Sequence, residues 1–158
     1  MVIVPLPKPP ELEKLLGALL MRPVKVVRAE DGVPPPAPHA TALFHTEEPV
    51  LQVLARADLG LAASLAAALS VLPAAAVKEC VAAGRMDESL QDNFVEVMNV
   101  LSRFVSGGGR TFRLGPVTCP PVAAAADLLA LVEGSDEKRL YSIEVPGFSA
   151  GRLEFVTL

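Results

Sequence analysis

The sequence predicts an α+β fold in which a mostly antiparallel sheet packs against two long helices. The chain has 158 residues, the size of one ordinary domain, and 51% of them are apolar, which is enough to form a core. Strand-like and helix-like segments mix without a regular β–α–β alternation. We therefore expect one domain over residues 1–158, without an internal repeat.

Proline divides the N-terminal third of the chain into short elements. Ten of the 15 prolines lie within the first 49 residues, and proline both fixes φ and lacks a backbone donor. We expect a proline-rich lead over residues 1–10, an amphipathic helix over 11–20, a short strand over 24–28 and a proline-rich loop over 31–38.

The middle of the chain predicts a hairpin followed by two helices. Residues 40–45 and 50–56 are rich in β-forming side chains and are separated by a short polar turn, so we expect them to pair. An alanine-rich helix over 59–72 follows, and a shorter helix over 74–83 ends at Gly84.

The most regular pattern predicts a long helix over residues 86–105. Its apolar residues recur at intervals of three and four and predict one buried stripe: Leu90, Phe94, Val97, Met98, Leu101 and Phe104. The glycine run 107–109 ends this helix. The helix is therefore the element whose faces the sequence assigns most directly.

The C-terminal third predicts extended segments and a terminal hairpin. In order, these are an extended segment over 111–119, a break at Pro120 and Pro121, an apolar stretch over 122–132, a linker over 133–137, and paired strands over 140–145 and 152–157. The two last strands flank a Pro-Gly turn, which favours an antiparallel pair.

Composition restricts the classes of partner. A formal net charge of −4 and a pI near 5.2 give no reason to expect nucleic acid. Residues 59–77 carry no charge, but Pro73 interrupts them. The helix before that proline would extend only about 21 Å, against roughly 30 Å of hydrocarbon. We expect a buried helix and no membrane partner.

Cysteine usage and the N-terminus predict a cytoplasmic protein. Pro5 and Pro7 interrupt the apolar start that an export signal needs. Cys80 and Cys119 lie far apart without metal-type spacing. We interpret them as two reduced thiols that pack as small apolar side chains, with one disulfide as the alternative.

Three patterns that suggest chemistry have a structural explanation. Residues 147–151 match the G-x-S-x-G pattern of hydrolases, but no helix, Asp or His follows them, so we expect a hairpin turn. Residues 106–110 are glycine-rich but close a helix, whereas a phosphate loop opens one. His39 and His45 lie six residues apart along a strand, too far to share a metal ion. We predict no metal site.

One face of the long helix carries polar residues at helical spacing. Glu88, Asp92, Glu96, Asn99 and Arg103 are separated by four, four, three and four residues, so they share one stripe opposite the apolar face. A solvated face is the ordinary interpretation of such a stripe. Asn99 favours a different interpretation, in which the face is presented to a partner. Asparagine is a poor helix former, and no cap or turn requires it in mid-helix.

Within this stripe, Asp92-x-x-x-Glu96-x-x-Asn99 resembles the signature helix of the CheC/CheX chemotaxis phosphatases. In that family an acid or serine, then a glutamate, then an asparagine share one exposed helix face, and a proline follows some twenty residues later. Here Pro120 and Pro121 fall in that range. The resemblance extends over most of residues 11–158 and implies a CheX-like domain.

The resemblance implies hydrolysis of the aspartyl phosphate on a CheY-like receiver protein. Glu96 would anchor on a receiver lysine, and Asn99 would position the attacking water. Asp92, Arg103 and Pro121 are the further residues expected to contact the receiver. The Mg²⁺ ion would belong to the receiver, so this chain would need no cofactor of its own, and a homodimer is the expected state.

Arg103 departs from the family pattern, in which a small residue, commonly glycine, stands one turn after the asparagine. A long cation there either adds a contact with an acidic receiver cleft or obstructs docking. The same superfamily includes flagellar switch proteins that bind partners without catalysis. A catalytically silent interaction domain is therefore the alternative function.

Overall fold

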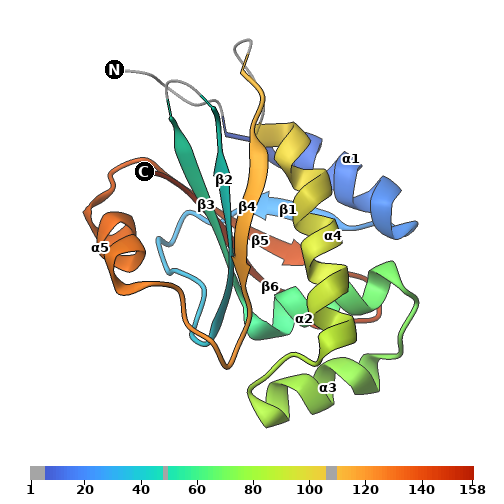
Figure 1. The fold of residues 1–158 in the computed structure, drawn as a ribbon. Helices are drawn as coiled ribbons and strands as arrows, with labels where there is room; N and C mark the ends of the chain where they lie inside the picture. The colour runs from blue at the N-terminus through green and yellow to red at the C-terminus, as the bar shows by residue number, and fades with distance from the viewer. Residues whose placement is uncertain (1–5, 48–49, 106–109) are drawn as a thin grey trace.

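The computed structural model describes residues 6–47, 50–105 and 110–158, and within them the chain forms a six-stranded sheet (Figure 1). The strand order is β1-β5-β6-β3-β2-β4, and each neighbouring pair is antiparallel. The strands are β1 (Lys25–Arg28), β2 (His39–His45), β3 (Gln52–Asp58), β4 (Arg113–Thr118), β5 (Lys138–Glu144) and β6 (Gly151–Thr157). The α+β fold with an antiparallel sheet is confirmed.

The helices cover the sheet unequally (Figure 1). They are α1 (Pro9–Leu20), α2 (Leu59–Leu69), α3 (Ala74–Ala83), α4 (Glu88–Val105) and α5 (Ala126–Gly134). Helices α1, α2 and α4 lie on one face, α3 packs against α2, and α5 lies on the opposite side (Figure 1). α4 packs against α2 and also contacts β4 and β2 directly.

Both predicted hairpins form. β2 pairs with β3 from His39 opposite Asp58 to His45 opposite Gln52, and β5 pairs with β6. Most element boundaries differ from the prediction by one to three residues, including the start of α4 at Glu88 and of β3 at Gln52. α1 includes the last two residues of the predicted lead, α2 ends at Leu69 and not at residue 72, and α5 occupies part of the predicted apolar stretch and linker. The predicted glycine terminator 107–109 lies outside the described residues.

The main core lies between the sheet and α1, α2 and α4. Alanine is the commonest buried residue of α2, where Ala62, Ala63, Ala66 and Ala67 are inaccessible to solvent. Because these side chains are small, α2 fits closely between the sheet and α4. The buried alanines of α2 therefore form the packing layer beneath α4.

The opposite face of the sheet has a smaller apolar cluster and a buried ion pair. Leu54 and Val156 pack there against Val132 of α5. Arg56 of β3 and Glu154 of β6 stand directly opposite each other, and Nη2 of the arginine lies 2.8 Å from Oε1 of the glutamate. Since both side chains are almost fully buried, each depends on the other for its counter-charge.

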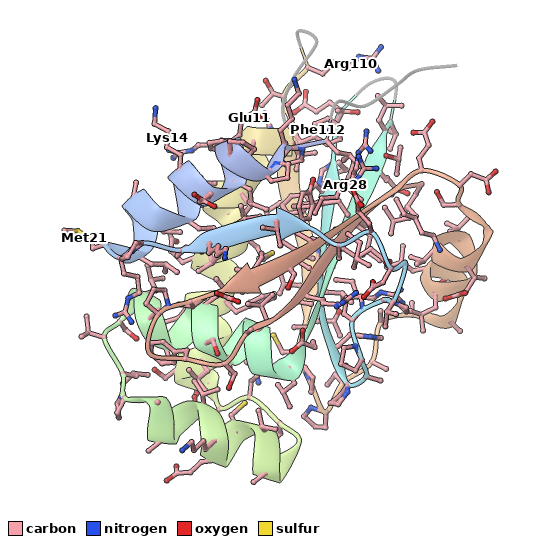
Figure 2. All side chains as sticks on the ribbon, turned by 180° about the vertical axis from the view of Figure 1, so that it is seen from behind. Glu11, Lys14, Met21, Arg28, Arg110 and Phe112 are labelled. Carbon is pink, nitrogen blue, oxygen red and sulfur yellow. The ribbon has the colours of Figure 1, made fainter. Side chains whose placement is uncertain are left out.

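Both outer strands of the sheet are protected. The Val26 N–H of β1 donates to Oε2 of Glu13, which reaches over from α1, at 2.9 Å. Figure 2, the view from behind, shows α1 beside β1 with Lys14 pointing away from the sheet. At the other edge, β4 contains Pro116, which has no N–H to offer, and its register with β2 is irregular. A further strand would therefore pair poorly with either edge.

Candidate functional site

Helix α4 presents the candidate site, and its inward side is firmly anchored. The apolar stripe is buried as predicted at Leu90, Phe94, Val97, Met98 and Leu101, with Phe104 half-buried and Val105 joining the core. This stripe attaches the helix along its whole length. An 18-residue helix held in this way positions its outer side chains on a rigid support.

Hydrogen bonds fix the start of α4 and its contact with α2. Oδ1 of Asp87 accepts the Leu90 N–H at 2.8 Å, which satisfies one of the free donors of the first turn. The Gln91 side-chain amide donates to the Met86 carbonyl at 2.7 Å. The Asn93 side chain donates to the Ala66 carbonyl at 3.2 Å, on α2. The rotation of α4 about its axis is thereby determined.

The predicted polar residues share the solvent face of α4. Asp92, Glu96, Asn99 and Arg103 are all exposed. Val95, which is 39% exposed, lies among them because it stands three residues after Asp92 and four before Asn99. We call Asp92, Val95, Glu96, Asn99 and Arg103 the docking stripe.

Val95 is the member of the docking stripe that the sequence-based interpretation missed. Its neighbours Phe94 and Val97 belong to the apolar stripe, and an isolated valine beside them is easily taken for core. The available signal is its spacing, because position 95 lies about 100° around the helix from the centre of the apolar stripe, at the border of the polar face. An exposed apolar side chain at this border can contact a partner beside Asn99.

The polar side chains of the docking stripe have no partners among the described residues. Within the described residues, Asp92, Glu96, Asn99 and Arg103 make no side-chain hydrogen bond or ion pair. The Ser102 hydroxyl donates to the Asn99 backbone carbonyl at 2.6 Å and leaves the Asn99 amide group available. Asp92 and Glu96 are like charges at i and i+4, an arrangement that disfavours the helix by a few tenths of a kcal/mol, ~0.2–0.5. These side chains therefore add little to the stability of the helix.

Comparison with solved structures shows what this arrangement of elements is similar to. A chain of the FliM–SpeE complex from H. pylori aligns with 94% of this chain and 80% of its own, at 7% identity and a TM-score of 0.65. FliY from Thermotoga maritima aligns with 91% of this chain and 80% of its own, at 13% identity and a TM-score of 0.59. CheX from Vibrio vulnificus aligns with 93% of this chain and 91% of its own, at 11% identity and a TM-score of 0.54. The chain has the CheC/CheX fold.

The likeness is one of fold. A CheC-like protein from Shewanella, CheX from Desulfovibrio desulfuricans and the FliM middle domain from H. pylori have the same fold. At these low identities the likeness carries no activity with it. No protein-family profile matches the chain, and no curated protein matches it either. The CheX-like fold that the sequence predicts is confirmed.

Pro121 lies away from Glu96 and Asn99 in this CheC/CheX fold. The neighbouring Pro120 carbonyl accepts the Met86 N–H at 3.0 Å, so the proline pair adjoins the N-terminal end of α4. From Glu88, the first residue of α4, to Asn99 the helix rises about 16 Å. Pro121 itself is exposed and lines a cavity of about 280 Å³ with His39 and Thr41. The structure brings four of the five predicted site residues together and leaves Pro121 apart.

The G-x-S-x-G segment has the structural role that the sequence predicts. Gly147 has φ +85°, a turn conformation that favours glycine. A Cβ at Gly151 would lie 2.6 Å from both Oδ1 of Asp58 and Cβ of Leu61. Ser149 between them is exposed. Glycine is therefore required at 147 by the backbone conformation and at 151 by the close approach of α2, so the match to the hydrolase pattern is accidental.

The histidines and cysteines lie outside α4, apart from the docking stripe. His39 and His45 stand at opposite ends of β2, and Nε2 of His39 lies 2.6 Å from the Pro35 carbonyl oxygen. In the described residues no group of three His, Cys, Asp or Glu side chains is placed to hold a metal ion. Both cysteines are free and buried, and burial raises the pKa of the Cys119 thiol to about 11. Thiols with a raised pKa react poorly.

Among the described segments, no helix combines the length and the apolar content that crossing a bilayer requires.

Proposed function

We propose that this protein hydrolyses the aspartyl phosphate of a CheY-like receiver. One observation carries the proposal: Glu96 and Asn99 stand three residues apart on a rigid, exposed helix face, and neither side chain has a partner within the described residues. The CheC/CheX fold and the resemblance of the helix to the signature of that family support it. The pathway in question would be chemotaxis or another two-component system.

The proposed chemistry depends on positioning. Water attacks the phosphorus of the aspartyl phosphate, and the bond from phosphorus to the aspartate oxygen breaks, with its electron pair going to the aspartate. The products are the free carboxylate and inorganic phosphate, which keeps the protons of the water. Asn99 would hold the water in line through its side-chain amide, and Glu96 would form an ion pair with a receiver lysine. Such a reaction needs little covalent help from the protein.

The remaining predicted properties follow from the same proposal. The receiver would supply Mg²⁺, and this chain would work in the cytoplasm beside its receiver. Asp92 and Arg103 would extend the contact to either side of the pair. Pro121 would touch the receiver only if the docked surface reached the N-terminal end of α4.

A homodimer belongs to the proposal, and the protected sheet edges restrict how it would form. The Glu13 carboxylate occupies the Val26 donor of β1, and Pro116 interrupts β4. Two copies would therefore associate through faces of the molecule and not by continuing the sheet. Sedimentation equilibrium should give twice the monomer mass of 16.6 kDa. A mass of one monomer at working concentration would contradict the dimer.

A catalytically silent interaction domain is the second candidate. Two matches from H. pylori, to a chain of the FliM–SpeE complex and to the FliM middle domain, have TM-scores of 0.65 and 0.59, above the 0.52 and 0.54 of two CheX structures. A chain of this kind would bind its partner and leave the phosphoryl group intact. Binding of a receiver without faster loss of phosphate would favour this candidate.

The two candidates are separated by following phosphate release from receivers. CheY-type receivers of the source organism are phosphorylated with phosphoramidate, freed of the donor, and mixed with the protein in increasing amounts. We expect Glu96→Ala to raise KM roughly tenfold because an ion pair is lost. We expect Asn99→Ala to lower kcat roughly 100-fold, the effect of removing a positioned hydrogen-bonding group.

Glu79→Ala is the matched control. Glu79 is an exposed acid of α3, away from the docking stripe, and its replacement changes the net charge by the same amount as Glu96→Ala. We expect it to behave as wild type. Equal effects of Glu79→Ala and Glu96→Ala would mean that net charge, and not the docking stripe, governs the encounter.

A further inference from the structure

Arg103 is the one cation of the docking stripe, all of whose members lie in described segments. It follows Asn99 by four residues, is exposed, and forms no ion pair with any described residue. The stripe therefore changes sign along the helix, from the acids Asp92 and Glu96 through the neutral Asn99 to Arg103. A partner that fits this order presents a cation beside Glu96 and an anion beside Arg103.

The direction of helical side chains brings Arg103 toward Asn99. Long side chains on a helix lean toward its N-terminus and cover the preceding turn. Residues at i and i+4 have their Cβ atoms only about 5–6 Å apart. The Arg103 guanidinium, at the end of a long flexible stem, can therefore reach the space in front of the Asn99 amide.

We infer, on the basis of the proposed function, that Arg103 contacts the phosphoryl group on which Asn99 acts. Its guanidinium donates to the non-bridging phosphoryl oxygens while water attacks the phosphorus and the aspartate carboxylate departs. Negative charge on those oxygens is the main electrostatic demand of phosphoryl transfer, and arginine can pair with two oxygens at once. Arg103 is in this sense a catalytic residue that the helix itself supplies.

A purely structural role for Arg103 makes a different prediction. Arg103 lies in the last turn of α4, where any cation interacts favourably with the helix dipole. A lysine would serve that role equally well. Lysine is a point charge without the planar pair of donors, so the two roles separate in Arg103→Lys.

The test measures kcat and KM for phosphate release from a phosphoramidate-labelled CheY-type receiver that the wild-type protein dephosphorylates. We expect Arg103→Gln to lower kcat roughly 10- to 100-fold, the effect of losing a charge-assisted hydrogen bond. Arg103→Lys should recover only part of that loss. The melting temperatures of both variants should stay close to that of wild type. Arg85→Gln, the same exchange at an exposed position before α4, is the control and should match wild type.

Each outcome bears on a separate claim. If Arg103→Gln retains the wild-type kcat, or Arg103→Gly exceeds it, the inference is wrong while the proposed function stands. If Arg103→Lys restores kcat fully, a point charge suffices and the bidentate contact is wrong. If the wild-type protein accelerates release from no receiver, the proposed function fails, and the role of Arg103 fails with it.

Discussion

Gly151 lacks a side chain because Asp58 and Leu61 occupy the space that one would need. The Asp58 carboxylate accepts the Leu61 N–H at 3.0 Å and the Arg152 N–H at 2.6 Å, so one side chain caps α2 and holds the start of β6. Sequence-based interpretation could place residues 147–151 in a turn. It could not find the partner of Gly151, because Asp58 is more than 90 residues away along the chain.

Gly151→Ala should therefore destabilise the protein by ~1–3 kcal/mol, the usual penalty for forcing an atom into filled space. Urea unfolding of wild type and variant measures this difference. Gly134→Ala is the control, because a Cβ at Gly134 meets nothing within 4 Å. Equal stability of Gly151→Ala and wild type would contradict the close approach of Asp58.

Asp31 and Arg152 fasten the proline-rich loop to the sheet. Nη1 and Nη2 of Arg152 donate to the two carboxylate oxygens at 2.5 and 2.6 Å, and Nη1 also donates to the Val33 carbonyl. The hydrogen bonds from Arg152, together with a weaker effect of the Val33 N–H, lower the pKa of Asp31 from 3.8 to about 2. Since the folded pKa lies below the unfolded one, the stabilisation is present above pH 3.8 and is lost as the pH falls toward 2.

The pKa of Asp31 can be followed by NMR of its side-chain carboxyl carbon. We expect Arg152→Gln to bring that pKa back toward 3.8, because the first and largest cause of the lowering is removed. Arg139→Gln, a change of the same charge elsewhere on the sheet, should leave it unchanged. An Asp31 that still titrates near 2 in Arg152→Gln would show that another group lowers its pKa.

At the scale of elements, α4 could be predicted from the sequence and α5 could not. The buried residues of α4 repeat over 18 positions, which specifies both faces and therefore the stripe of Asp92, Glu96, Asn99 and Arg103. α5 has nine residues, of which only Val132 is buried. A single buried residue cannot define a helical repeat, so the apolar stretch 122–132 did not indicate a helix.

Asp87 is the residue on which the start of α4 depends. Asp87→Ala removes the acceptor of the Leu90 N–H and should lower stability by ~1 kcal/mol. Differential scanning calorimetry measures the change. Ser89→Ala, in the exposed first turn, is the control and should have little effect. If Asp87→Ala has the same melting temperature as wild type, the cap contributes nothing to the anchoring of α4.

At the scale of the whole molecule, the sheet order brings together segments that local patterns cannot relate. β1 pairs with β5, more than 100 residues later, and Arg56 meets Glu154 at a separation of 98 residues. A charged residue in a strand is ordinarily expected at the surface. Pro121 could not be placed for the same reason, because its distance from Asn99 depends on the path of the chain through β4.

The buried pair of Arg56 and Glu154 predicts a distinctive double-mutant result. Glu154→Leu alone leaves a buried guanidinium without its counter-charge and should destabilise by ~3–5 kcal/mol. Arg56→Met combined with Glu154→Leu should recover most of that loss, because two apolar side chains of similar volume replace the pair. Chemical denaturation of all four species completes the cycle. Simple additivity of the two single changes would show that the side chains do not interact.

The proposed phosphatase activity is tested by the rate constant of phosphate release from a phosphorylated receiver at saturating protein, compared between wild type and Asn99→Ala. Wild type should accelerate release well beyond the receiver's own rate. Asn99→Ala should bind the receiver with similar affinity and release phosphate roughly 100-fold more slowly than wild type. Equal acceleration by the two proteins would contradict the role of Asn99, and acceleration by neither would contradict the phosphatase.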